Sequence, residues 1–404
     1  MGDPGLVAGP DLLAEWEGIR AVDHHCHPLL RWPLDLTPIG LRAVFTEAGD
    51  PVIVRDHVPN AVAYRGAIAC LASALDCEAT EEAILAARAA EEPGAYANRL
   101  LEQTGTGVLL LDHGFGGDAV FTPAEHRREI SLPQHEIVRL ETLAEDLAPD
   151  AGDPSGWREA VRAGLEAAVD GGACAVKTIA AYRSGLQLRR HSPDEVAGEF
   201  SRWRATMSRD PAHPDGSTHA RPRLSSKALC DTLVFDAAAC CRALDVPLQV
   251  HCGFGDPDED LALASPLGLR PLFEDPALAG LNVALLHCYP YHREAAYLTA
   301  VYPGAFMDLS LAVPLAATDG AQALGEALGL CPWSKLLYGT DASRLPELYF
   351  VAATRQREAL ATALADLVDD GFLSGDEAVE AGRRVLEGNA TALYRIQPDH
   401  PLTA

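Results

Sequence analysis

Eight short apolar segments, each rich in Val, Ile, Leu or Ala, constrain the fold of this chain more than any other feature. They alternate with longer segments rich in Ala, Leu, Glu and Arg, such as residues 155–170 and 227–244. Strands buried on both faces are continuously apolar, and their alternation with helical segments indicates βα units around a parallel sheet. The predicted strands are residues 21–25, 107–113, 136–141, 173–179, 247–251, 283–287, 305–309 and 335–339. Eight such units predict an α/β protein with a distorted (β/α)8 barrel.

Two connections are too long to be simple loops. Residues 28–106 follow the first strand and contain helical patterns such as residues 81–101, so we predict a helical insertion there. Residues 187–226 follow the fourth strand and are rich in Arg, His and Pro, which predicts a long loop. Both would emerge at the mouth of the barrel, where active sites form, as lids or pocket walls; decoration or an oligomer contact is the alternative. With no linker in view, we predict a single domain over residues 1–404, ending in a helical segment over residues 376–396.

The charge and composition exclude several kinds of partner. The net charge is −26 and no basic stretch compensates it, so we expect no binding to nucleic acid or to anionic membranes. Neither a secretory signal nor an apolar run of about 18 residues is present, which predicts no membrane span. The ten cysteines form no C-x-x-C pair, as in a reduced cytoplasmic protein.

Residues 23–27 read Asp-His-His-Cys-His, directly after the apolar part of the first strand. Because side chains alternate along a strand, His25 and His27 should share a face and reach one ion, with Asp23 one step further back and His24 pointing away. Imidazole nitrogen is a common metal ligand. On this motif alone, a metal site and a polar strand end with incidental histidines are equally good interpretations.

Metal-type ligands recur at the ends of other predicted strands. Lys177 lies on strand four, His251 on strand five and His287 on strand six, while Asp341 follows strand eight. One such residue alone is usually structural, but coincidence at five strand ends is hard to obtain by chance. Because the carboxyl ends of barrel strands surround one mouth, the pattern predicts a metal centre there.

The order His-x-His, Lys, His, His, Asp on these strands resembles the amidohydrolase superfamily of metal-dependent barrels, over essentially the whole chain. Three stretches are similar in particular to the amidohydrolase-like half of nodulin/glutamine-synthetase-type fusion proteins. These stretches are residues 177–186, residues 249–256 with the following Ala264-Ser265-Pro266, and residues 388–394.

The resemblance implies that His25, His27 and His251 are nitrogen ligands and Asp341 an oxygen ligand of a divalent metal. Zinc is the first choice and manganese or iron the alternative. Such a metal activates water near neutral pH. Asp341 would take the proton of that water and pass it to the leaving group, and the metal or His287 would polarise the scissile carbonyl.

Lys177 has three possible roles, and the number of metal ions, one or two, depends on which role it has. As a carboxylated lysine it would bridge two metals; as a free amine it would act in catalysis or hold a substrate carboxylate. As a structural residue it would form an ion pair, with Glu141 as a candidate partner; Glu141 could equally be a spare metal ligand.

Four residues near the mouth are candidates for substrate binding. Arg183 and Arg344 suit bidentate capture of a carboxylate, with a surface or acid-paired arginine as the alternative for each. Tyr182 and Tyr289 could line the pocket, and for Tyr289 a structural role is the stronger alternative.

Together these observations predict a metal-dependent amidohydrolase that cleaves a C–N bond of a small, carboxylate-bearing molecule. The resemblance suggests a γ-glutamyl amide as substrate and a homo-oligomer as the assembly. One alternative is a metal-dependent decarboxylase of the same superfamily, which releases CO₂ instead of an amine. The other is a non-catalytic barrel, in which some of the ligand positions should be degraded.

Overall fold

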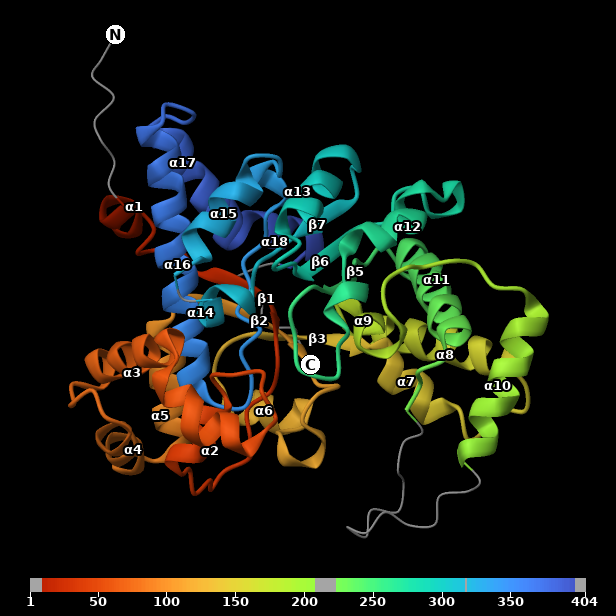
Figure 1. Cartoon of the computed structure of the whole chain (residues 1–404), viewed down its shortest axis with the longest axis horizontal. Coiled ribbons are helices and arrows are strands. Elements are labelled where there is room, and N and C mark those ends of the chain that lie inside the picture. The colour runs from red at the N-terminus through yellow and green to blue at the C-terminus, as the bar shows by residue number, and fades with distance from the viewer. Residues whose placement is uncertain (1–8, 208–222, 317, 397–404) are drawn as a thin grey trace.

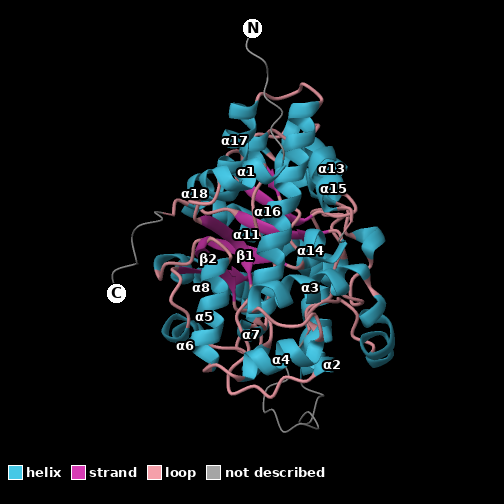
Figure 2. Cartoon of the chain, turned by 90° about the vertical axis from the view of Figure 1, so that its left-hand side faces the viewer, coloured by secondary structure: helices cyan, strands magenta, loops and turns pink. Residues whose placement is uncertain are grey.

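Seven parallel strands form one curved sheet in the computed structural model, which describes residues 9–207, 223–316 and 318–396. Their order in the sheet follows the chain, so every neighbour is reached by a crossover connection. Figure 2 shows the strands in the middle of the molecule with helices around them. The strands are β1 (Ala21–Cys26), β2 (Thr106–Asp112), β3 (Gln134–Arg139), β4 (Ala175–Thr178), β5 (Leu248–Cys252), β6 (Val283–His287) and β7 (Ala305–Met307).

The predicted eighth strand is present as an extended segment without a ladder of its own. Leu336 forms one isolated parallel bridge with Met307 at the end of β7, and the Leu337 N–H donates to the Met307 carbonyl at 2.8 Å. On its other side, the His24 N–H of β1 donates to the Tyr338 carbonyl at 3.2 Å. The segment therefore lies between β7 and β1 and joins the two edges of the sheet. The prediction of a distorted (β/α)8 barrel is confirmed, with seven regular strands and one irregular closing segment.

The helices that follow the strands begin at residues suited to helix starts. Asp153 caps the helix that begins at Pro154, and Ser374 with Glu377 forms a capping box. The helices are α1 (Gly9–Glu15), α2 (Pro38–Ala43), α3 (Val62–Leu75), α4 (Glu81–Ala89), α5 (Pro93–Gln103), α6 (Pro123–Glu129), α7 (Leu140–Leu147), α8 (Pro154–Asp170), α9 (Ala180–Ser184), α10 (Pro193–Met207), α11 (Lys227–Leu244), α12 (Arg270–Glu274), α13 (His292–Val301), α14 (Ala312–Ala316), α15 (Gly320–Leu328), α16 (Pro346–Asp369), α17 (Gly375–Arg383) and α18 (Asn389–Tyr394).

The two insertions differ in detail from the sequence prediction. The helical pattern over residues 81–101 forms two helices, α4 and α5, because Glu92 caps a new helix that begins at Pro93. The segment after β4, predicted as a loop, contains the helix α10; residues 208–222 of this insertion lie outside the described part. In Figure 1, α2 to α5 lie at the lower left and α10 at the right, on opposite flanks of the strands.

The barrel interior and one of its ends are filled by apolar side chains. Val22 of β1, Leu110 of β2 and Leu286 of β6 are fully or almost fully buried in one cluster with Leu393 and Tyr394 of α18. The terminal helix thus packs against the barrel interior, as predicted for residues 376–396. Within the described residues no single helix is long and apolar enough to cross a membrane, although the bent pair Ile53–Asn60 and Val62–Leu75 together passes the same test of length and composition.

Candidate metal centre

Two histidines from β1 converge on one carboxylate oxygen. The Nε2 atoms of His25 and His27 lie 3.2 and 3.1 Å from Oδ1 of Asp341. His25 donates its Nδ1–H to Oε1 of Gln249 at 2.9 Å, and His27 donates its Nδ1–H to the Asp112 carbonyl at 2.9 Å. These acceptors place the ring proton on Nδ1, so both Nε2 atoms present a lone pair to the carboxylate.

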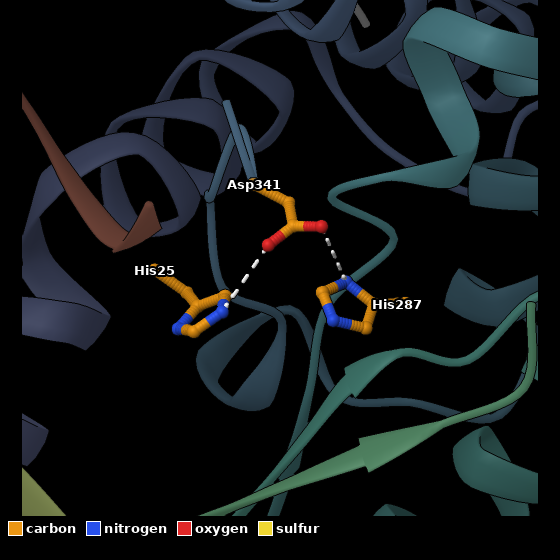
Figure 3. Close-up of side chains that lie close together, drawn as sticks. All are labelled: His25, His287 and Asp341. Atoms are coloured by element: carbon orange, nitrogen blue, oxygen red, sulfur yellow. Dashed lines mark ion pairs between the residues drawn. The ribbon is translucent and has the colours of Figure 1, made fainter. Parts of the chain in front are cut away.

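His287 and His251 extend the group along β5 and β6. His287 Nδ1 lies 2.7 Å from the Ser310 hydroxyl and 4.0 Å from Oδ2 of Asp341, while its Nε2 is buried without a hydrogen-bond partner among the described residues. Figure 3 shows His25 and His287 on either side of Asp341. The His251 ring lies 4.5 Å from that of His287, centroid to centroid, and its Nε2 is 3.2 Å from a Glu259 oxygen.

This donor set fits a divalent cation. The Nε2 lone pairs of His25 and His27 both face Oδ1 of Asp341, and no proton lies between His27 and this oxygen. A cation between these atoms would stabilise the arrangement. Two groups bring their ligand atoms within 4.8 Å of one another, namely His25 with His287 and Asp341, and His25 with His27 and Asp112. The second group was not expected from the sequence, and His251 belongs to neither.

Burial and neighbouring charges keep these groups in the protonation states that metal ligands need. Burial, followed by the positive charge of Lys177, lowers the pKa of His25 to about 3, so its imidazole is neutral at pH 7. Burial alone would raise the pKa of Asp341, but its contacts with His287, His25 and His27 outweigh burial and hold this pKa well below its usual range. Asp341 is therefore ionised.

The backbone at two site residues is strained. Asp341 has a φ of 53° and His287 a φ of 67°, in the left-handed region that residues other than glycine seldom occupy. Such a conformation costs roughly 1–2 kcal/mol per residue and is concentrated at functional sites. Here it turns both side chains at the ends of their strands.

Lys177 pairs with different partners from those expected. Its Nζ lies 2.8 Å from Nε2 of His25 and 3.7 Å from Oδ2 of Asp112, and Asp112 also accepts from Arg139 at 2.6 Å. Glu141 is not its ion-pair partner, because that residue begins the first turn of α7 and accepts hydrogen bonds from the Thr178 hydroxyl and the Ile179 N–H. Burial lowers the pKa of Lys177.

A buried network that sequence reasoning missed lies beneath the histidines. Nε2 of Gln249 donates to the Tyr394 hydroxyl at 2.9 Å, that hydroxyl lies 2.8 Å from Nδ1 of His24, and Nε2 of His24 lies 2.6 Å from Asp308. Asp308 in turn accepts from the Ser310 hydroxyl at 3.0 Å. The network thus connects the partner of His25 to the partner of His287.

Three residues of this network left a signal in the sequence. Gln249 stands two positions before His251, so strand alternation places it on the same face. Asp308 and Ser310 follow β7 two positions apart, as His25 and His27 do at the end of β1. His24 points away from the candidate ligands, as predicted, whereas Asp23 binds the Thr340 N–H and hydroxyl and is not among the residues that line the cavity.

A cavity of about 830 Å³ opens over these residues, and we call it the central cavity. Both insertions contribute to its wall, through residues 43–50 and Arg223. Eight residues singled out from the sequence line it, namely His27, Lys177, Tyr182, Arg183, His251, His287, Asp341 and Arg344. Tyr289 does not line it, because its hydroxyl donates to Asp319 at 2.8 Å, and His25 lies beneath its floor.

Fold and site together define the class of metal-dependent barrel hydrolases. The chain belongs to the amidohydrolase family Amidohydro_2, whose model matches residues 22–396. The predicted resemblance to the amidohydrolase superfamily is therefore confirmed, and membership implies a divalent metal.

Individual relatives agree with this assignment. Protein fluG of Emericella nidulans is 26% identical over 412 residues, which cover 95% of this chain and 46% of that protein. The chain thus spans about half the length of this curated relative. A crystal structure of a proposed metal-dependent hydrolase from Lactobacillus casei ATCC 334 is 32% identical, with a TM-score of 0.83 over 95% of this chain and 97% of that one. A uronate isomerase from Bacillus halodurans C-125, 10% identical, shares the fold with a TM-score of 0.67 over 98% of each chain.

Proposed function

We propose that this protein is a metal-dependent amidohydrolase that cleaves the C–N bond of a small, carboxylate-bearing amide. The observation that carries the proposal is the convergence of two unprotonated imidazole nitrogens on one oxygen of Asp341. This convergence lies at the carboxyl ends of the strands, beneath a cavity large enough for a small molecule. The similarity to the proposed metal-dependent hydrolase from Lactobacillus casei supports the metal-dependent hydrolysis in this proposal.

The residues around the site suit the steps of amide hydrolysis. A divalent metal, zinc in our proposal, would be held by His25, His27, His251 and Asp341 and would supply Lewis acidity. Asp341, ionised and with its Oδ2 directed toward His287, suits a general base that carries a proton to the leaving nitrogen. Since the Ser310 hydroxyl donates to Asp308, it accepts from Nδ1–H of His287, and the unpartnered Nε2 of His287 is left with a lone pair that can accept a hydrogen bond from a reacting water.

Lys177 keeps two roles in the proposal. Burial lowers its pKa, which increases the share of the neutral amine, the form that reacts with CO₂ to give a carboxylated lysine able to bridge two ions. As a free amine it would instead hold a proton beside His25, and one ion would suffice. Whether the site holds one or two ions therefore depends on whether Lys177 is carboxylated.

The substrate class follows from the cationic side chains of the central cavity and from the superfamily subgroup. Arg344 and Arg183 both line the cavity, and because Arg183 already pairs with Glu145 at 3.3 Å, Arg344 is the one better suited to a substrate carboxylate. A γ-glutamyl amide has such a carboxylate and is the substrate that the subgroup suggests. We also propose a cytoplasmic homo-oligomer.

The test is release of amine from a panel of γ-glutamyl and other N-acyl amides by protein supplied with zinc, compared with Asp341→Asn. We expect hydrolysis by the wild type and at least a roughly thousandfold loss in kcat for the variant, since this change removes the proton carrier and one candidate ligand. A circular dichroism spectrum of the variant that matches the wild type excludes unfolding. Equal turnover by the two proteins would overturn the proposed mechanism.

A metal-dependent decarboxylase is the second candidate, because aromatic side chains stand next to the arginines of the cavity. The Tyr182 ring lies 4.4 Å from the His251 ring, centroid to centroid, with the two planes tilted by 51°, and the centre of the Phe115 ring lies 4.9 Å from the guanidinium carbon of Arg344. Such a wall also suits a conjugated acid. Release of CO₂ from aromatic carboxylates, without amine release from any amide, would favour this candidate.

A further inference from the structure

Most charged side chains around the central cavity already have a partner. Arg139 pairs with Asp112 and Arg183 with Glu145, at 2.6 and 3.3 Å. At the rim, Arg223 pairs with Asp258 at 2.8 Å. Beyond these pairs, a few charged side chains line the cavity without an ion-pair partner among the described residues.

Arg344 is the cation of this set. Its guanidinium stacks on Phe115 but forms no ion pair with any described residue. Its backbone is fixed on both sides, since its N–H donates to the Pro28 carbonyl at 3.1 Å and its carbonyl accepts from Leu30 at 2.9 Å. The side chain is therefore held in place with its hydrogen-bond donors free for an anion.

Glu47 and Asp256 are the corresponding anions. Both line the cavity, and within the described chain neither forms an ion pair. Burial, followed by repulsion from Asp341 and Asp256, raises the pKa of Glu47 to about 7, although the charge of Arg344 acts in the opposite direction. A cation bound among these acids would relieve that repulsion.

A separate observation concerns a buried carboxylate, Glu259, next to the wall of the cavity. The Glu259 side chain is 2% exposed, and while its Oε2 faces His251, its Oε1 is buried without any described partner. The neighbours of this carboxylate, His251 and Tyr182, line the cavity. An unsatisfied buried carboxylate oxygen is costly. Glu259 does not itself line the cavity, but its negative charge adds to the repulsion on Glu47 and favours a cation beside that residue.

We propose that the central cavity receives an α-amino acid head group, with its carboxylate on Arg344 and its ammonium on Glu47 and Asp256. The substrate would then be an amino acid whose side chain carries the scissile amide. This inference narrows the substrate class of the proposed function, and it rests on that proposal for the reaction itself. One cation and two acids that form no ion pair within the described chain line the same cavity and match a zwitterion, whereas a simple dicarboxylate would leave the acids unpaired.

The first test measures binding alone, by calorimetry on the zinc-supplied protein. The probes are three pairs that differ only in the α-ammonium group, namely L-aspartate and succinate, L-glutamate and glutarate, and L-2-aminoadipate and adipate. We expect at least one amino acid to bind about tenfold or more tightly than its desamino partner, as is typical of a charged hydrogen bond. Equal or weaker binding of the amino acid in all three pairs, or no binding at all, would overturn the inference.

The variants Glu47→Gln and Asp256→Asn then assign the preference to these residues. Each should reduce the preference toward unity and leave binding of the desamino acid within about twofold. Asp50→Asn is the matched control, because Asp50 is an exposed acid at the same rim whose side chain accepts from the Val52 N–H. A preference that survives both substitutions would contradict the assignment. Loss of one metal equivalent in either variant would show that these acids hold an ion instead.

Hydrolysis separates failure of the inference from failure of the proposed function. We expect the KM for glutaryl p-nitroanilide to exceed that for γ-L-glutamyl p-nitroanilide about tenfold or more in the wild type, and Glu47→Gln to remove most of this difference with little change in kcat. If neither anilide is cleaved while the calorimetric preference holds, the zwitterion site stands and the amide hydrolase fails. If both are cleaved with equal KM values, the hydrolase stands and the zwitterion site fails.

Discussion

Substitution of Tyr394 by phenylalanine tests whether the buried network supports the candidate metal centre. The Tyr394 hydroxyl is fully buried, donates to Nδ1 of His24 and accepts from Nε2 of Gln249. Its removal leaves one N–H of Gln249 Nε2 and the Nδ1 of His24 unsatisfied, at about 1–2 kcal/mol each, so we expect the free energy of unfolding to fall by about 2–4 kcal/mol. Since Gln249 fixes the tautomer of His25, zinc affinity should also fall about tenfold.

Both quantities are measured on the same preparation, by urea denaturation of the metal-free protein and by competition with a zinc chelator. The matched control is Tyr302→Phe, which removes an exposed hydroxyl bonded to Glu274 and should cost less than about 1 kcal/mol without a change in zinc affinity. If Tyr394→Phe changes neither quantity, the network does not position His25. If stability falls and zinc affinity is unchanged, the network is structural only.

Three further predictions concern stability and turnover. Asp112→Asn should lower the free energy of unfolding by about 3–5 kcal/mol in urea denaturation, because it leaves the buried guanidinium of Arg139 unpaired; the exposed-pair control Asp236→Asn should cost less than about 1 kcal/mol. Burial lowers the pKa of His126 to about 4, so only the unfolded chain takes up its proton between pH 6.5 and 4. The stability of the wild type should therefore fall over that range by up to about 3 kcal/mol more than that of His126→Asn, and parallel pH profiles would contradict this. Zinc-supplied protein should lose amide turnover when zinc is removed and regain it on readdition, whereas unchanged turnover in chelator would refute the metal requirement.

The barrel could be predicted from the sequence because each buried strand is a short apolar segment, and these segments alternate with helical segments along the chain. Continuous apolar runs located all seven regular strands to within a few residues. The closing segment around Leu336 has the same apolar pattern but forms single hydrogen bonds, and this depends on how the two sheet edges meet, which no local pattern encodes. Pro93 was visible in the sequence, yet the helical pattern across it concealed the break between α4 and α5.

The site could be predicted only where it follows from strand ends. His25, His27, His287 and Asp341 meet because parallel strands present their ends at one mouth. Residues that reach the cavity or its surroundings from insertions or distant helices have no such regularity. Glu47 comes from the insertion after β1 and Tyr394 from the terminal helix, so their approach depends on packing between segments far apart in the chain. The prediction that Tyr289 lines the pocket was wrong, because the loop after β6 directs its hydroxyl to Asp319.

The metal content per chain, measured by elemental analysis, tests whether the converging histidines and Asp341 hold a metal ion. The proteins to compare are the wild type and a His25→Asn/His27→Asn double variant, both purified without chelator and then supplied with zinc. We expect one or two equivalents in the wild type and loss of at least one in a variant that remains folded. A wild type that holds no metal and takes up none, or a variant with the same content as the wild type, would contradict this expectation.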